Sequence, residues 1–521
     1  GADVMKKLLC MLLALAMLTG CAAGPTETTG PVQTTAPAAG GEVLIRLSDE
    51  GVEFPENSGV HVANDIIYYE AGHGEDYGEG EAWEAHTPEE AAAHTVVHIT
   101  RPGVYRLTGQ LSLGQIAVDL GENAKDDPTA AVVLILDNAE IICRVAPAVI
   151  FYNVYECGDK DVSSPGIDTS RAGANVVIAD GTVNNVSGAY VAKIYKPDTV
   201  ELNAAGTEVE DAKKLHKYDA AFYSKMSMNV DGGTGVLNID AENEGLDSEL
   251  HLTINGGNIN ITSGNDGINT NEDNISVTTV NGGALNIVVD GTTGEGDGID
   301  SNGWLVINGG SVTASACSIS GDAGIDSDKG IYLNGGNVVA GGNMLDQIAG
   351  SEQNYAVFTF SERVTGGTTI TMKAEDDGVV GEWELTNDYT YLIVSGTGLK
   401  EGTYTLWKDN VQMSVAKTDG KMPGKMMPGG GFPGGERPEG ERPQMPEGEL
   451  PGGQLPDGEF PDRENGWENG YFLRAFYDDG TKKPITIYIS SPGGECDVGF
   501  AIVDCINELK RKGVEVQTIC I

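Results

Sequence analysis

The feature that most constrains this sequence is a repeat of 24 to 27 residues in its central part. Between residues 220 and 341 a glycine pair recurs at these intervals, and a second turn motif related to Gly-Ile-Asp-Ser falls between successive pairs. A fixed period of this length predicts one supersecondary unit per repeat, and such units are stable only when they stack. The first glycines of the pairs are Gly232, Gly256, Gly282, Gly309 and Gly335.

Between the turns, apolar residues occupy every second position. Leu250, Leu252 and Ile254 share one face of a segment, and Ile259 and Ile261 share a face of the next. This period of two predicts half-buried strands. Strands and repeat together predict an all-β right-handed parallel β-helix (solenoid) over residues 96–345, because parallel crossovers are almost always right-handed. A row of hairpins in an antiparallel sandwich is the open alternative.

The first 20 residues predict a signal peptide, with Lys6 and Lys7 before a short apolar run. The following Leu18-Thr19-Gly20-Cys21 resembles the lipobox of bacterial lipoproteins. That resemblance implies lipidation of Cys21 and a secreted protein, lipid-anchored at the extracellular face of the cell membrane. Ordinary signal cleavage near Ala22 is the alternative.

The remaining segments differ in composition. We expect a tether at 21–42, an acidic lead-in of undefined structure at 43–95, a small flanking β module at 346–420, a disordered Gly/Pro/Met linker at 421–465 and a short α/β fragment at 466–521.

The formal net charge of the chain is −46, from 32 basic and 78 acidic residues. A surface of this sign repels phosphate backbones, so nucleic acid is not an expected partner. It suits calcium, which prefers carboxylate and carbonyl oxygens.

Stacking of the second turn motif predicts two acidic columns. Adjacent carboxylates about 4.8 Å apart would repel by roughly 3–4 kcal/mol at an effective dielectric constant near 20, and bound Ca²⁺ would turn this repulsion into attraction. The alternative is that these side chains only make local turn hydrogen bonds. The predicted metal ligands are Asp247, Asn269, Asp300 and Asp326 in one column, and Glu244, Asp266 and Asp297 in its neighbour.

Aromatic side chains are predicted on the outward face of the repeats. Alignment on the Asn-Gly-Gly turn places Trp304 in one column with His251, and Tyr332 in the adjacent column with Thr253. Aromatic rings on a flat sheet can stack against sugar rings, so Trp304, Tyr332 and His251 are candidate carbohydrate-binding residues. Alternatively, a loop or the 346–420 module covers these rings.

Residues 96–465 resemble a family of secreted bacterial carbohydrate-binding domain-containing proteins. The resemblance rests on the Gly-Ile-Asp-Ser and Asn-Gly-Gly turns, the run Asp219-Ala-Ala-Phe-Tyr-Ser-Lys225 and the Gly/Pro/Met linker. It implies a fold similar to that of pectate lyases, bound calcium, and binding of cellulose or acidic plant polysaccharide.

The expected function is therefore that of a cell-surface lipoprotein that binds polysaccharide, either a plant cell-wall glycan or a bacterial surface glycan. A calcium-dependent polysaccharide lyase and a non-catalytic adhesin are the alternatives. A lyase would need a basic side chain as its base, and Lys329 is the only Lys or Arg in residues 226–341.

The C-terminal segment resembles the opening of Clp-type serine peptidase subunits. Its Ser491-Pro-Gly-Gly494 turn matches the family's oxyanion-hole segment, which implies that role for Gly493 and Gly494. The family's nucleophile and base would follow Ile521, so we expect a fragment without activity. The joining of two neighbouring genes would explain a peptidase fragment behind a lipoprotein signal. A Clp-like serine peptidase is a further alternative function.

Overall fold

The computed structural model describes the chain in six stretches, namely residues 41–72, 78–196, 199–202, 209–418, 485–489 and 516–520. The chain divides into two compact units, Gly1–Gly430 and Gly431–Ile521, and each is considered by itself. The predicted lipidation site Cys21, the linker 421–465, and Gly493 and Gly494 lie outside the described residues.

The second unit contributes two described strands, β35 (Ile485–Ile489) and β36 (Val516–Cys520), which pair in parallel.

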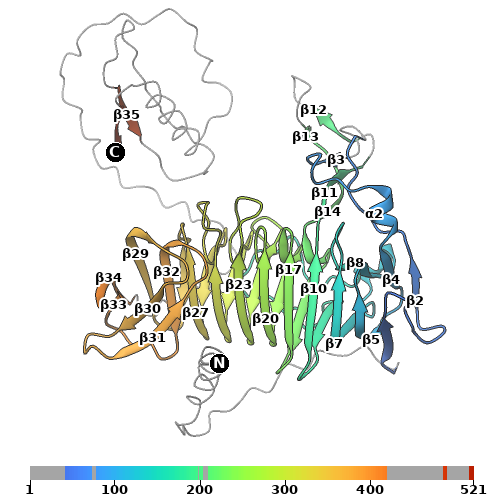
Figure 1. Cartoon of the computed structure of the whole chain (residues 1–521), viewed down its shortest axis with the longest axis horizontal. Coiled ribbons are helices and arrows are strands. Elements are labelled where there is room, and N and C mark those ends of the chain that lie inside the picture. The colour runs from blue at the N-terminus through green and yellow to red at the C-terminus, as the bar shows by residue number, and fades with distance from the viewer. Residues whose placement is uncertain are drawn as a thin grey trace, which may run out of the picture. The chain divides into compact units, whose positions relative to one another are not determined.

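The described part of the first unit is nearly all strand (Figure 1). Its helical elements are one short α-helix, α2 (Pro88–Ala92), and one 3₁₀ helix, η1 (Glu122–Asp126). Among the described residues no helix is long and apolar enough to cross a membrane.

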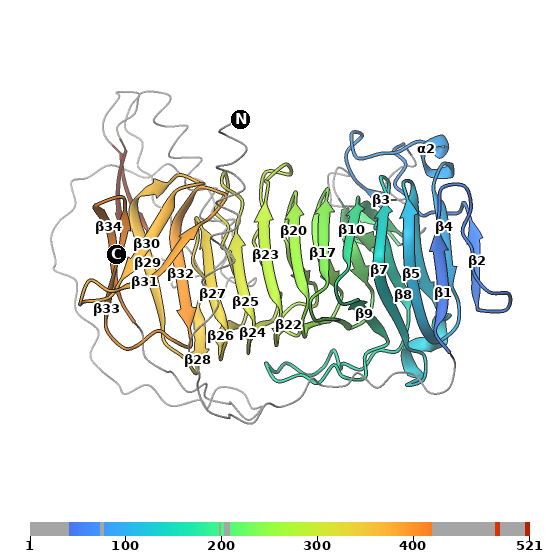
Figure 2. The ribbon, with the colours of Figure 1, turned by 60° about the horizontal axis from the view of Figure 1, so that its bottom comes forward.

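The strands of the repeats form two long ladders in which each repeat pairs in parallel with the next. The first ladder consists of β9 (Ala174–Ile178), β16 (Met228–Gly232), β19 (His251–Ile254), β22 (Val277–Val280), β24 (Trp304–Ile307), β26 (Gly330–Leu333) and β28 (Ile348–Ser351). The second consists of β10 (Val183–Gly188), β17 (Val236–Ala241), β20 (Asn258–Ser263), β23 (Ala284–Val289), β25 (Ser311–Ser315) and β27 (Asn337–Gly342). Figure 2 shows the strands of the second ladder side by side.

The expected fold class, a right-handed parallel β-helix with a separate small β module, is wrong. Both ladders belong to one 18-stranded sheet, because β5 (Gly103–Leu111) and β7 (Val132–Ile142) run through both. The first part of β7 pairs with β9 and its last part with β10. Gly109 in β5 (φ 99°) and Asn138 in β7 (φ 54°) take left-handed conformations where these strands turn from one ladder to the other.

The large sheet is also mixed, which a parallel solenoid would not be. The last strand of the second ladder, β27, pairs antiparallel with β32 (Tyr389–Gly396), and β32 pairs antiparallel with β29 (Tyr355–Val364). Beside it, four strands form an antiparallel sheet: β30 (Thr369–Lys373), β31 (Val379–Glu384), β33 (Thr403–Lys408) and β34 (Val411–Lys417). The observed architecture is an all-β fold around one large, mostly parallel mixed sheet with almost no helix.

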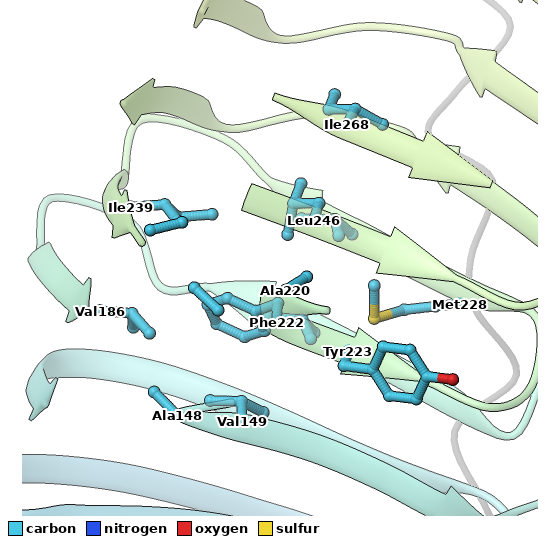
Figure 3. Close-up of a cluster of buried hydrophobic side chains, with 14 of the residues drawn as sticks. Ala148, Val149, Val186, Ala220, Phe222, Tyr223, Met228, Ile239, Leu246 and Ile268 are labelled. Carbon is cyan, nitrogen blue, oxygen red and sulfur yellow. The ribbon is translucent and has the colours of Figure 1, made fainter. Parts of the chain in front are cut away.

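A seven-stranded sheet faces the large one, and the core lies between them. In Figure 3, Phe222 and Leu246 on successive strands of this sheet face Val186 and Ile239 of the second ladder, and Ile268 follows on the next strand of the sheet. Each such fully buried side chain contributes about 1.5–3 kcal/mol relative to its exposed state. The strands are β2 (Val60–Ala63), β4 (Thr95–Ile99), β6 (Gly114–Asp119), β8 (Val149–Asn153), β15 (Ala220–Ser224), β18 (Glu244–Ser248) and β21 (Ile268–Thr270).

The acidic lead-in adds a strand to each of these two sheets, although the sequence predicts no definite structure for it. Its strand β1 (Val43–Leu47) pairs in parallel with β5, and β2 pairs antiparallel with β4. An insertion before β15 contains β11 (Val191–Tyr195) and β14 (Lys214–Tyr218), which form a small sheet with β3 (Gly78–Glu79) of the lead-in. The insertion also contains the pair β12 (Glu201–Leu202) and β13 (Val209–Asp211).

The Asn-Gly-Gly turns stack in register. The asparagine of each turn donates a side-chain hydrogen bond to that of the preceding repeat, at 2.9–3.0 Å, along Asn255, Asn281, Asn308 and Asn334. The second glycine of each turn has a positive φ, for example 95° at Gly257 and 87° at Gly283, which explains the glycine pair.

Candidate functional site

The outward face of the first ladder carries two neighbouring aromatic rings. Trp304 on β24 and Tyr332 on β26 are both half-buried, and their ring centroids lie 5.9 Å apart at an interplanar angle of 57°. Strand pairing places Trp304 one strand from Val277 and Tyr332 one strand from Val306. The indole Nε1 donates a hydrogen bond of 3.3 Å to Ser163 Oγ, which fixes the orientation of the ring.

His251 occupies the same column as Trp304, as the alignment predicts, because His251 pairs with Val277 and Val277 pairs with Trp304. It is completely buried, however. Its Nδ1 accepts a 3.1 Å hydrogen bond from the backbone amide of Val277. Burial, with a further contribution from Lys160, lowers the pKa of His251 to about 4, so the ring is neutral at pH 7.

A covering segment around residues 156–170 explains the burial of His251. Gly158 packs so closely on it that an added Cβ would lie 2.7 Å from His251 Cδ2. Further along the segment, Thr169 donates a 2.7 Å hydrogen bond to Thr253, the outward neighbour of His251. The alternative of a covering loop therefore holds for His251, whereas Trp304 and Tyr332 keep exposed surface.

The predicted acidic columns are present as two stacked rows, here called the acidic rows. Asp247 pairs with Asn269, and the bridge between Ile268 and Ile299 continues the stack to the next repeat. In the neighbouring row the amide of Gly245 donates to the carbonyl of Asp266, and the amide of Gly267 to that of Asp297. The structure thus brings the seven predicted ligands into adjacent repeats.

Within the acidic rows, two groups of carboxylates converge. Asp219, Glu244 and Asp247 form a buried group, and Asp297, Asp300 and Asp326 form a half-buried one. Within each group, one carboxylate oxygen from every residue lies within 4.8 Å of the others. Six ionised carboxylates at such separations are strongly repulsive unless protons or cations compensate them.

Sequence reasoning missed Asp219 and Lys217. The ammonium of Lys217 lies 3.0 Å from Asp219 Oδ2 and is the one cation in contact with the buried group among the described residues. A signal was available, because Asp219 precedes Glu244 by 25 residues, one repeat length.

The pKa values in the acidic rows are raised throughout. Burial, followed by the charge of Asp219, raises the pKa of Glu244 to about 8. Burial is also the first cause for Asp326, whose pKa rises to about 7, and for Asp300, whose pKa rises to about 6. Burial and neighbouring carboxylates raise the pKa values of Asp247, Asp266 and Asp297 well above the usual range.

Two buried oxygens beside these carboxylates have no hydrogen-bond partner among the described residues. They are Glu244 Oε2 and Asn269 Oδ1. Asn269 Nδ2 donates a 3.1 Å bond to the other oxygen of Glu244, so both residues are oriented while one oxygen of each is left unsatisfied. An unsatisfied buried oxygen costs about 1–3 kcal/mol. Carboxylate and amide oxygens are the donors that calcium prefers, so this set fits a Ca²⁺ ion.

Comparison with known proteins defines the class of this chain as carbohydrate-binding. Residues 93–398 match the model of the carbohydrate-binding domain-containing protein family. This match spans more than half of the chain, and the chain belongs to that family. Residues 473–521 match the Clp protease family model. The predicted resemblance to a carbohydrate-binding domain-containing family and to the Clp peptidase family is confirmed, whereas secretion and lipidation of the chain stay predictions.

Among solved structures, the chain is similar to one described as the polysaccharide lyase-like protein from C. thermocellum, gadolinium derivative. The identity is 19% and the TM-score 0.35, over 57% of this chain and 90% of that one. No curated protein matches the chain.

Proposed function

We propose that the chain binds polysaccharide on the outward face of the first ladder, with Trp304 and Tyr332 as the stacking surface. The observation that carries this proposal is the pair of partly exposed rings on adjacent strands of a parallel ladder, with centroids 5.9 Å apart, in a member of a carbohydrate-binding family. A sugar ring has apolar faces and a polar rim, so it gains contact with an aromatic face without losing its hydrogen bonds to water.

The hydrogen bond from Trp304 to Ser163 supports the proposal. It anchors one edge of the indole to the covering segment and so reduces the side-chain entropy that binding would otherwise remove. The polymer is a plant cell-wall or bacterial surface glycan.

Calcium is part of the proposal as a structural ion of the acidic rows. Asp219, Glu244, Asp247 and Asn269 would hold one ion, and Asp297, Asp300 and Asp326 a second. The ion would neutralise carboxylates that the fold places together and so would stabilise the repeats that carry the aromatic rings.

The site of action belongs to the proposal too. Lipidation of Cys21 would hold the protein at the extracellular face of the membrane, where insoluble glycans are accessible. Metabolic labelling with a palmitate analogue would test this, since Cys21→Ser should abolish incorporation of the label.

The binding proposal is tested by retention of the full chain on insoluble cellulose and on cross-linked polygalacturonate. Trp304→Ala should weaken retention about tenfold, and the double variant with Tyr332→Ala should weaken it further, because about 1.4 kcal/mol of contact free energy corresponds to one decade of affinity. Trp83→Ala is the matched control, since Trp83 is 74% exposed and lies in the lead-in. Unchanged retention of the double variant, with wild-type binding intact, would place the glycan elsewhere.

A further inference from the structure

A basic pocket of about 510 Å³ lies beside β14, and neither Trp304 nor Tyr332 is among the residues that line it. Five lysines line it, although the chain has only 32 basic residues against 78 acidic ones. They come from η1, the covering segment, β14 and the residue that follows β15. They are Lys125, Lys160, Lys214, Lys217 and Lys225. The scarcity of basic side chains in residues 226–341 is therefore a property of the repeats and not of the whole molecule.

Two of these lysines form ion pairs, and three have no ion-pair partner among the described residues. Lys160 pairs with Glu272 and Lys217 with Asp219. For Lys125, Lys214 and Lys225 the structure shows no ion pair with any residue that it describes. Burial, and then the nearby charges of Lys217 and Lys193, lower the pKa of Lys214, although the carboxylates of Glu249 and Asp219 oppose this shift.

Three acidic side chains also lie in the pocket wall, and the structure shows no ion pair between them and Lys125, Lys214 or Lys225. Glu156 accepts 2.7 Å hydrogen bonds from the backbone amides of Gly158 and Ser227, so its carboxylate holds the covering segment in place. Glu249 accepts a hydrogen bond from the hydroxyl of Tyr223. Asp126 is the remaining acid of the wall.

The other walls suit a sugar ring better than a bare inorganic anion. Leu215 is 40% exposed and Met226 is half-buried, so both offer apolar surface to the pocket. The volume lies within the range of about 300–1,000 Å³ that is usual for small-molecule sites. An ammonium group attracts an anion from any direction, so lysines can accept a carboxylate in several ring orientations.

We propose that this lysine pocket binds one carboxylate-bearing sugar unit of the polysaccharide, at a site separate from the aromatic rings. This inference rests on the proposed function, because it takes the ligand to be a glycan. The pocket volume of about 510 Å³ suits a single acidic sugar unit of the polymer.

Acetylation footprinting on the full chain tests the pocket without any substitution. Trigalacturonate should slow acetylation of Lys214 and Lys225, read by mass spectrometry, and leave the exposed Lys400 and Lys408 unchanged. Its methyl ester, which lacks the charge, should not protect. Equal protection by acetate at the same carboxylate concentration would overturn the inference, because it would show a general anion patch.

Substitution then measures affinity. The double variant Lys214→Gln and Lys225→Gln should bind trigalacturonate about tenfold more weakly, and the corresponding arginine double variant should recover binding. The control double variant, Lys400→Gln and Lys408→Gln, changes the net charge equally. If the double variant Lys214→Gln and Lys225→Gln bound trigalacturonate with unchanged affinity, the inference would be wrong.

The two proposals fail in different ways. Retention on neutral cellulose should depend on Trp304 and not on Lys214. If trigalacturonate does not protect the lysines from acetylation while Trp304→Ala is no longer retained on cellulose, the pocket proposal is wrong and the aromatic-face proposal is supported. If trigalacturonate protects the lysines and Trp304→Ala is still retained on cellulose, the aromatic-face proposal is wrong and the pocket proposal is supported.

Discussion

The asparagine ladder of the turns and the acidic rows share one geometry and differ in chemistry. Both place a polar side chain of one repeat beside that of the next. An amide donates and accepts, so Asn281 can donate to Asn255 and accept from Asn308. An ionised carboxylate only accepts, so stacked carboxylates cannot satisfy one another.

The consequence is visible in the raised pKa values of the acidic rows and in the unpartnered oxygen of Glu244. Each further repeat adds a side chain of the same kind at the same position, with the same need for a hydrogen-bond donor or a counter-charge. Amides stacked in this way need nothing from outside the chain, whereas carboxylates need protons or cations. The comparison is therefore a prediction that the acidic rows bind cations and the asparagine ladder does not.

Removal of calcium should produce the largest effect. At a free calcium concentration one hundred times the Kd, each occupied site stabilises the folded state by about 2.7 kcal/mol. Thermal unfolding of the full chain in chelator and in a calcium series should show Tm rising with calcium, with magnesium at the same concentrations giving a smaller shift. A Tm that is the same in chelator and in millimolar calcium would remove calcium from the proposal.

The effect of Asp300→Asn on the free energy of unfolding should be opposite in sign with and without calcium. In chelator at pH 7 the variant should be more stable than wild type by about 3 kcal/mol, because Asp300 is ionised in an environment that raises its pKa to about 6. A raised carboxyl pKa contributes stability that is fully present below about pH 4 and is lost as the pH rises through about 6. The gain should therefore vanish at pH 4, and in calcium the variant should be less stable than wild type.

Urea unfolding at the two pH values, with and without calcium, measures these differences. Asp240→Asn is the matched control, since Asp240 is exposed on β17 and outside the acidic rows. A loss of stability for Asp300→Asn in chelator would mean that the row is satisfied without a cation.

The sequence predicts register well, because period two and a fixed turn leave little freedom. A slip of one residue would move every apolar side chain to the other face. For this reason the columns of Trp304 and of Asp247 are where the alignment places them. The predicted fold class is wrong because the period of the repeat does not indicate the bends at Gly109 and Asn138. Gly and Asn at such points are typical of any turn.

Features built from distant segments could not be predicted. The burial of His251 depends on Gly158, which lies 93 residues earlier, and nothing in its local spacing indicates that contact. The lysine pocket likewise joins Lys125 with Lys225. Such contacts arise where loops leave the repeats, so periodicity carries no information about them.

The smallest effect comes from converting part of the ladder into an acidic row, with Asn281→Asp and Asn308→Asp together. This change removes two donors and places two carboxylates in adjacent repeats, where exposure limits their repulsion to about 1 kcal/mol. The pair Asn281→Ala and Asn308→Ala is the control, because it removes the same donors without adding charge. At pH 7 the aspartate pair should be the less stable in urea, and below pH 4 protonated carboxyls can donate again, so it should become the more stable. If the aspartate pair matched the alanine pair at both pH values, charge would not distinguish the two kinds of column, and the case for cations in the acidic rows would lose its physical basis.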